Sequence, residues 1–124
     1  MDKKDLTSSI IGSAIEVHRH LGPGLLESVY EECLSYELEL QGLRVERQLA
    51  CPIQYKGRHF DVGYRIDLFV NKNTIVELKS IKRIEPIHEA QILTYLRLLD
   101  VRYGLILNFN VPVLKQGIRR MLNG

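Results

Sequence analysis

Three charged residues in the middle of the chain have the types and spacing that hydrolysis of a phosphate ester would need. Asp67 interrupts one apolar stretch, and Glu77 and Lys79 interrupt the next one. Because side chains two positions apart in a β-strand share a face, Glu77 and Lys79 are expected on the same side. Charged side chains are rarely buried unless they are paired or coordinate an ion. Two carboxylates on one sheet face could hold Mg²⁺, which prefers oxygen ligands, and activate a water molecule.

The candidate cluster sets a condition on the strands that form it. Alternation predicts a strand over residues 64–70, with Asp67 on one face and the apolar residues on the other: Ile66, Leu68 and Val70. A turn over residues 71–74 and a second strand over residues 75–81 follow. A regular four-residue turn would place Asp67 opposite Leu78, on the wrong face. Asp67 lies opposite Glu77 or Lys79 only if the loop has an odd length or the strand has a bulge.

A second interpretation of the same three residues involves no metal. Lys79 would form a cross-strand ion pair with Asp67 or Glu77 on a solvated sheet face, and such pairs stabilise a sheet only weakly. In the metal interpretation, Lys79 would instead position or deprotonate the attacking water, or stabilise negative charge. On these three residues alone, both interpretations stay open.

The surrounding elements predict an α/β fold with a mixed central β-sheet flanked by α-helices. Apolar residues recur at helical spacing over residues 6–20, 26–41 and 86–99. Residues 42–63 contain strand-like stretches, and residues 103–109 contain a continuous apolar run that is typical of a buried strand. Residues 114–121 are expected to form a short basic helix. With 124 residues, we expect one domain over residues 1–124.

Composition gives only broad limits. The net charge is +2 and the sequence pI is about 8.6, a weak indication of an anionic partner. Neither a membrane-spanning apolar run nor a signal peptide is evident, so we expect no membrane association. Cys33 and Cys51 match no metal-binding spacing and are expected to be reduced thiols in a cytoplasmic protein.

Three motifs together resemble a known group of proteins. Asp67 followed by Glu77-Leu78-Lys79 resembles the core of the PD-(D/E)XK nuclease superfamily, although Ile66 replaces the usual proline. Gln91 and Tyr95 match a Gln-x-x-x-Tyr motif on the helix that follows this hairpin in some branches. Residues 24–30, Gly-Leu-Leu-Glu-Ser-Val-Tyr, match the signature of the small prokaryotic GxxExxY proteins, a branch of the same superfamily.

The resemblance implies a restriction-endonuclease-like core and a set of roles. Mg²⁺ or Mn²⁺ would be held by Glu27, Asp67, Glu77 and the carbonyl of Leu78. Lys79 would assist the attacking water. Gln91 and Tyr95 would orient the substrate or the catalytic groups, and Lys82, Arg83 and His88 are candidates for contacts with the phosphate backbone.

Each of these additional residues also has a purely structural interpretation. Glu27 could stabilise the positive end of a helix dipole. Gln91 and His88 could be surface residues, and Tyr95 a core residue. Lys82 and Arg83 could belong to an ordinary solvated rim of the protein.

Two functions therefore remain. The first is metal-dependent hydrolysis of phosphodiester bonds in nucleic acid, with DNA favoured over RNA. The second is a non-catalytic module on a nuclease fold that binds nucleic acid or a protein. Because the chain is small and shows no separate recognition domain, a homodimer or a targeting protein would supply specificity in either case.

Overall fold

The structure is a computed structural model, and it describes residues 5–124. Its elements in chain order are α1 (Thr7–Leu21), α2 (Glu27–Leu40), β1 (Val45–Ala50), β2 (Ile53–Tyr55), β3 (Arg58–Phe60), β4 (Arg65–Val70), β5 (Thr74–Lys79), α3 (Pro86–Leu99), β6 (Tyr103–Asn108), the 3₁₀ helix η1 (Leu114–Gly117) and β7 (Ile118–Leu122). The three predicted helices are confirmed, each to within one residue at either end.

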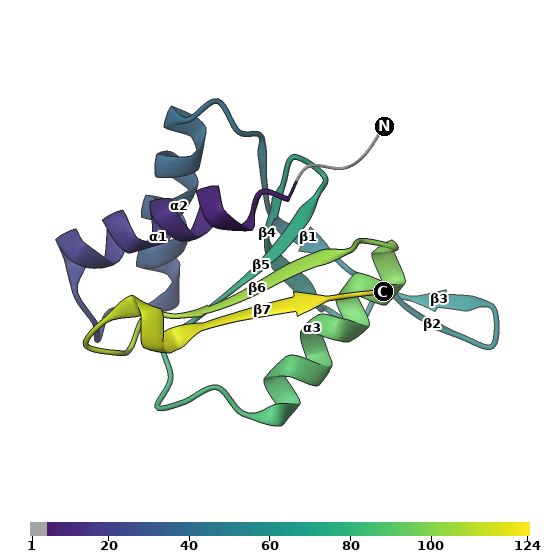
Figure 1. Cartoon of the computed structure of the whole chain (residues 1–124). Helices are drawn as coiled ribbons and strands as arrows, with labels where there is room; N and C mark the ends of the chain where they lie inside the picture. Colours follow the sequence, from purple (N-terminus) through teal and green to yellow (C-terminus); the bar gives the residue numbers. More distant parts are fainter. Residues whose placement is uncertain (1–4) are drawn as a thin grey trace.

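Five strands form the central sheet, in the order β1-β4-β5-β6-β7. All neighbouring pairs are antiparallel except β5 and β6, which are parallel and are joined through α3. Helices α1 and α2 cover one face of the sheet and α3 covers the other (Figure 1). The expected mixed sheet flanked by helices is confirmed.

Each face of the sheet has its own hydrophobic core, and strand β5 contributes to both. Val76 and Leu78 pack under α1 and α2, whereas Ile75 packs under α3. Because side chains alternate along a strand, Glu77 and Lys79 belong to the α3 face with Ile75. The strand is almost fully buried, so the acid of Glu77 lies within the sheet interior and not on a solvated surface.

Strand β4 departs from the simple alternation that the sequence predicts. Leu68 and Val70 pack under α1 and α2, but Ile66 packs in the α3 core, so the expectation that all three share one face is wrong. The change of face occurs at Asp67. The neighbouring strand is distorted at the same level, where Gln48 has a φ of 51°. A left-handed residue in an edge strand is not visible in a hydrophobic pattern.

The helix expected over residues 114–121 is also wrong. A single turn of 3₁₀ helix ends at Gly117, and Ile118–Leu122 then pairs with β6 as an edge strand. Gly117 makes this approach feasible, because a Cβ there would lie 2.1 Å from the carbonyl oxygen of Asn108. Long-range pairing therefore decides the structure of the C-terminal segment, which local propensity alone does not determine.

A second, two-stranded sheet extends from the body of the molecule. β2 and β3 form a hairpin closed by Lys56 and Gly57, both with positive φ as a type I′ turn requires. The hairpin projects outward from the body of the molecule (Figure 1). Over the described residues, no helix combines the length and apolar character that crossing a bilayer requires.

Candidate active site

The loop between β4 and β5 sets the register of the candidate acids. Val70 pairs with Thr74, so the loop comprises the three residues 71–73, of which Asn71 and Lys72 have positive φ. Continued along the strands, this register places Asp67 opposite Glu77. The loop has the odd length that the sequence analysis required, and both acids can therefore meet on one side of the hairpin.

The two carboxylates replace backbone groups in the hydrogen bonding between the strands. The Asp67 N–H donates to Glu77 Oε2 over 3.0 Å, and the Leu78 N–H donates to Asp67 Oδ2 over 2.7 Å. Each acid is therefore held by the strand of the other. These two backbone hydrogen bonds fix both side chains without a cationic partner.

Burial makes this pair of acids electrostatically unfavourable when no cation is nearby. Glu77 is 6% exposed. Burial and the negative charge of Asp67 raise the pKa of Glu77 to about 8, and burial also raises the pKa of Asp67. The ammonium group of Lys79 opposes both increases in pKa without cancelling them. It forms no ion pair within 4.0 Å in residues 5–124. A divalent cation would offset the repulsion that Lys79 leaves in place.

The donor set fits a hard cation with a sparse protein shell. In the described part of the chain, no three His, Cys, Asp or Glu side chains are grouped so that they could hold a metal ion together. Two carboxylates and a backbone carbonyl nevertheless match Mg²⁺, which usually retains several waters and takes only one or two carboxylates from the protein. Asp67, Glu77 and the Leu78 carbonyl are the groups that would supply these oxygen atoms.

Glu27 lies at the end of β5. It is the first residue of α2, and its Oε2 accepts a hydrogen bond of 3.0 Å from the Ser80 N–H. The Ser80 hydroxyl in turn donates to the Leu25 carbonyl over 2.7 Å. The charge of Glu27 also contributes to the raised pKa of Glu77. This position allows both interpretations of Glu27, the dipole-stabilising acid and the third carboxylate of a metal site.

Tyr30 explains the spacing of the Gly-x-x-Glu-x-x-Tyr signature. Its buried hydroxyl donates to the Gly22 carbonyl over 2.6 Å and accepts from the Leu25 N–H over 3.1 Å. Its ring stacks on Phe109, with centroids 4.3 Å apart. Tyr30 therefore fixes the loop that leads into α2, and with it the position of Glu27. The sequence analysis gave this tyrosine a place in the signature but no structural role.

Gln91 and Tyr95 are brought together on α3, on the side of Glu77. The Gln91 Nε2 donates to the Tyr95 hydroxyl over 2.9 Å, and Tyr95 is 3% exposed. Burial and the nearby charge of Glu77 raise the pKa of Tyr95 to about 12. The phenol is therefore protonated at neutral pH and available as a hydrogen-bond donor. Both residues line a pocket of about 360 Å³.

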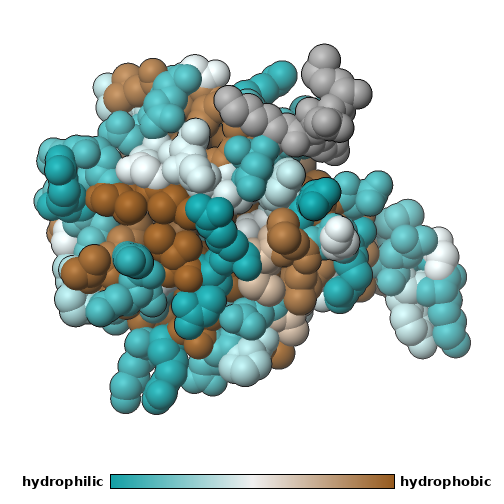
Figure 2. Space-filling model, in the orientation of Figure 1, coloured by the Kyte–Doolittle hydropathy of each residue, from teal (hydrophilic) through white to brown (hydrophobic). Residues whose placement is uncertain are grey.

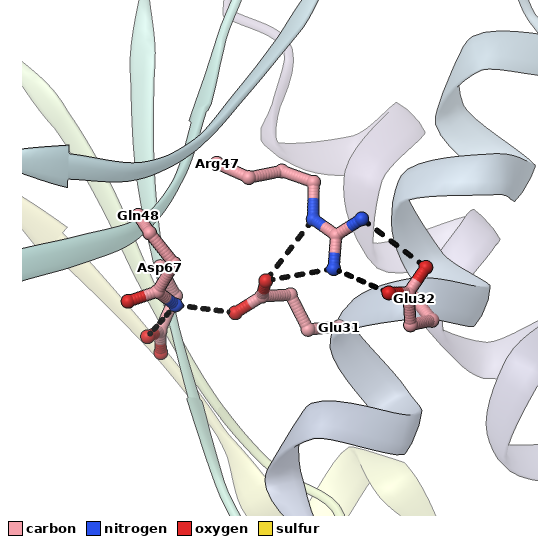
Figure 3. A network of polar contacts seen from close by, with 5 residues as sticks. All are labelled: Glu31, Glu32, Arg47, Gln48 and Asp67. Carbon is pink, nitrogen blue, oxygen red and sulfur yellow. Dashed lines mark hydrogen bonds and ion pairs between the residues drawn. The ribbon is translucent and has the colours of Figure 1, made fainter.

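A polar network that the sequence analysis missed supports Asp67 from the other side (Figure 3). The Gln48 Nε2 donates to Asp67 Oδ1 over 3.2 Å and to Glu31 Oε1 over 2.6 Å. Arg47 pairs with Glu31 at 2.9 Å and with Glu32 at 3.0 Å. Glu31 follows Glu27 by four residues, a helical spacing that could have indicated a second acid on the same side of α2. Nothing in the sequence identifies Gln48.

The candidate substrate-binding residues fall into two groups, because Lys82 and Arg83 line a different pocket from His88. Lys82 and Arg83 are exposed in the segment that follows β5. The His88 Nδ1 accepts a hydrogen bond of 2.9 Å from the Glu85 N–H at the start of α3, and His88 lines the same pocket as Gln91 and Tyr95. His88 therefore stabilises a helix terminus, while its other ring nitrogen remains free for a further contact.

The end of β5 is fixed by a buried amide. Asn108 accepts from the Ile81 N–H over 3.1 Å and donates to the Ile81 carbonyl over 3.0 Å. The Phe109 N–H donates to the Lys79 carbonyl over 2.9 Å. The parallel pairing of β5 with β6 thus continues past the last strand residues, so the backbone that presents Lys79 is held on both sides.

Comparison with known proteins supports the resemblance at the level of the superfamily. The model of the PD-(D/E)XK nuclease superfamily matches residues 4–121, which include every candidate residue described above. No curated protein and no solved structure matches the chain.

Proposed function

Because the chain belongs to the PD-(D/E)XK nuclease superfamily, we propose that it is a metal-dependent nuclease that hydrolyses phosphodiester bonds, with DNA as the favoured substrate. The observation that best supports this proposal is the pairing of the half-buried Asp67 with the buried Glu77. Each acid accepts a backbone hydrogen bond from the opposite strand, and Lys79 lies on the same sheet face two positions further on. We treat residues 1–124 as one nuclease-like domain with a restriction-endonuclease-like core.

Mg²⁺ or Mn²⁺ is the cofactor that this donor set favours. Asp67, Glu77 and the Leu78 carbonyl would hold it, with the carboxylate of Glu27 close to the same strand end. When bound, such an ion lowers the pKa of a coordinated water and offsets negative charge on the phosphate.

Other residues of the chain would activate the water and position the substrate. Lys79 would hold or deprotonate the attacking water, or stabilise developing negative charge, since no carboxylate among residues 5–124 pairs with its ammonium group. The protonated Tyr95 would donate a hydrogen bond toward the site, with Gln91 fixing its hydroxyl. Lys82, Arg83 and His88 would contact phosphates on either side of the scissile bond.

We further propose that the chain represents the GxxExxY branch. Gly24, Glu27 and Tyr30 provide the signature, and Tyr30 gives it a structural reason by fixing the loop before α2. Cys33 and Cys51 are free thiols, which is consistent with a reducing compartment such as the cytoplasm.

The direct test is cleavage of labelled single- and double-stranded DNA and RNA with Mg²⁺ or Mn²⁺. Wild-type protein is compared with Lys79→Ala and with Lys115→Ala, which removes an exposed lysine from η1 and serves as a matched control. We expect cleavage by the wild type and the control, and loss of cleavage in folded Lys79→Ala. Equal cleavage by all three proteins would exclude the role assigned to Lys79.

One observation favours a second function, a binding module without catalysis. The acid pair has no third carboxylate, histidine or cysteine grouped with it in residues 5–124. A module of this kind would bind nucleic acid or a protein, with a second copy or a targeting protein as partner. A ligand that binds only the folded state raises its stability, so thermal unfolding with Mg²⁺ and Mn²⁺ separates the two functions. No shift, together with no cleavage on any substrate, would favour the binding module.

A further inference from the structure

The β2–β3 hairpin has an unusual composition for a segment that belongs to no core. Residues 52–60 contain Lys56, Arg58 and His59 and no acidic residue. Two aromatic side chains in the same segment are exposed, Tyr55 at 63% and Phe60 at 37%. The hairpin projects from the molecule, and most of its surface is hydrophilic in Figure 2. Exposed aromatic rings gathered on one projecting segment, rather than scattered over the surface, are typical of a binding site.

The register of the hairpin places the aromatic and cationic groups on one face. Ile53 pairs with Phe60 and Tyr55 pairs with Arg58, so these four side chains share a side, while Gln54 and His59 lie on the other. The Arg58 guanidinium lies over the Phe60 ring at 5.0 Å, and the Lys56 ammonium lies 5.4 Å from the Tyr55 ring centre. A positive charge therefore accompanies each exposed ring.

This face continues into the pocket beside the candidate active site. Ile53 lines the pocket of about 360 Å³ together with Tyr64, Gln91 and Tyr95. The rings of Tyr64 and Tyr95 meet edge to face at 6.3 Å, and Tyr64 is 44% exposed. A series of rings therefore leads from the hairpin to the side chain that stands next to Glu77.

The charge around this series suits an anionic chain. Asp61 follows the hairpin directly, but it is paired with Arg65 at 3.3 Å and so leaves little negative charge. Aromatic rings that alternate with cations are the features by which proteins bind single-stranded nucleic acid, since unstacked bases expose their faces and phosphates follow the basic groups. A double helix hides those faces within its own stack, so it could use only the cations.

We propose that the hairpin face and the adjoining pocket form a binding track for single-stranded nucleic acid, with bases stacked on Tyr55, Phe60 and Tyr64. Lys56 and Arg58 contact the phosphates. That the bound nucleic acid continues to the Asp67–Glu77 pair rests on the proposed nuclease function. The binding itself does not depend on that function.

Binding is measured with fluorescein-labelled oligothymidylate, which forms no duplex, and with a duplex of equal length. All proteins carry Lys79→Ala and are kept in EDTA, so no cleavage interferes. Because a stacked base contributes about 5- to 150-fold to affinity, we expect Tyr55→Ala and Phe60→Ala each to weaken oligothymidylate binding within that range. Tyr36→Ala on α2 removes an equally exposed tyrosine, at 64%, and should leave the affinity unchanged.

Salt dependence tests the cationic part of the track separately. Each phosphate contact contributes roughly −0.7 to the slope of log K against log salt for a single strand, so Lys56→Ala and Arg58→Ala should make the slope shallower by about that amount. Tyr55→Ala should lower the affinity at every salt concentration and leave the slope unchanged. Equal oligothymidylate affinity in the Lys79→Ala parent protein and in its Tyr55→Ala and Phe60→Ala derivatives, or no binding by the parent protein, would overturn the track.

A small diester separates the track from the catalytic proposal. Bis(p-nitrophenyl) phosphate has no bases to stack along a hairpin, so a Tyr55→Ala/Phe60→Ala double variant with Lys79 intact should hydrolyse it with Mn²⁺ at the wild-type rate. The same variant should lose oligonucleotide cleavage. Aromatic-dependent binding without hydrolysis of either substrate would support the track and exclude the nuclease. Hydrolysis of both substrates at wild-type rates by the double variant would overturn the track alone.

Discussion

Replacing Glu77 by glutamine should stabilise the metal-free protein in alkaline solution. Glu77 is 6% exposed, and burial and the charge of Asp67 raise its pKa from 4.5 to about 8. Between about pH 4.5 and 8, Glu77 therefore keeps its proton in the folded protein but has lost it in the unfolded chain. The stability linked to this proton is fully present below that window and is lost as the pH rises through about 8.

The size of the effect can be bounded. At about 1.4 kcal/mol per pKa unit, the rise in the pKa of Glu77 sets a ceiling of about 5 kcal/mol. Because water penetration and side-chain movement screen buried charges, we expect about 1 to 3 kcal/mol. Glutamine keeps a carbonyl oxygen that can accept the Asp67 N–H, so Glu77→Gln removes the charge and preserves the hydrogen bond at 3.0 Å.

The assay is urea unfolding followed by far-ultraviolet circular dichroism, in EDTA, at pH 5.5, 7.0 and 8.5. Wild type should lose stability across this range, whereas Glu77→Gln should lose much less and exceed wild type at pH 8.5. Glu39→Gln, an exposed glutamate on α2, should follow wild type. Adding Mn²⁺ at pH 8.5 should raise the unfolding free energy of the wild type and leave that of Glu77→Gln unchanged. Parallel pH curves for wild type and Glu77→Gln would refute the argument that the buried acid is the source.

Two further substitutions test the supports of the site. Tyr30→Phe leaves two backbone groups of residues 22–25 without their partner and should cost about 1 to 3 kcal/mol of unfolding free energy, measured by urea unfolding; an unchanged midpoint would contradict this. Gly117→Ala should destabilise by several °C in thermal unfolding, since its Cβ would lie 2.1 Å from the Asn108 carbonyl oxygen. Gly12→Ala, in an open position on α1, should stabilise by about 0.5 to 1 kcal/mol, so equal effects of the two alanines would count against the close approach.

The parts of the fold that the sequence predicted are those fixed by local patterns. Pro86 begins α3 at the predicted residue because proline favours the first turn of a helix and cannot continue one. Glu77 and Lys79 share a face because a strand repeats every two residues. The resemblance then supplied Gln91 and Tyr95, and the structure brings them into contact.

The parts that the sequence did not predict depend on long-range geometry. Ile66 changes face because the strands are distorted at Asp67 and at Gln48, whose φ of 51° has no signature in its residue type. Residues 118–122 become a strand because the edge of β6 is free to pair and Gly117 allows the backbones to approach. The support of Asp67 by Gln48 likewise appears only once β1 and β4 are paired.

The distribution of charge around the acid pair connects the site to the binding track. Arg47, the cationic residue of the network in Figure 3, pairs with Glu31 and Glu32 and does not neutralise Asp67. Without a bound cation, the Asp67–Glu77 pair would repel a phosphate, whereas the hairpin would still attract one. Binding to the hairpin and binding across the acid pair should therefore respond differently to metal.

This difference predicts two components of oligonucleotide affinity. In EDTA, the contribution of Tyr55 and Phe60 persists, because their stacking involves no metal. Ca²⁺, which prefers oxygen ligands and serves as a non-cleaving probe, should increase the affinity for the oligonucleotide further. Asp67→Asn should abolish this metal-dependent increase, and Tyr55→Ala should leave it intact. Fluorescence anisotropy with oligothymidylate, with and without Ca²⁺, measures both. In EDTA, Asp67→Asn should bind the oligonucleotide more tightly than wild type, because it removes a charge that repels phosphate. If it bound no more tightly, and if Ca²⁺ did not increase the affinity of wild type, the acids would not face the bound strand.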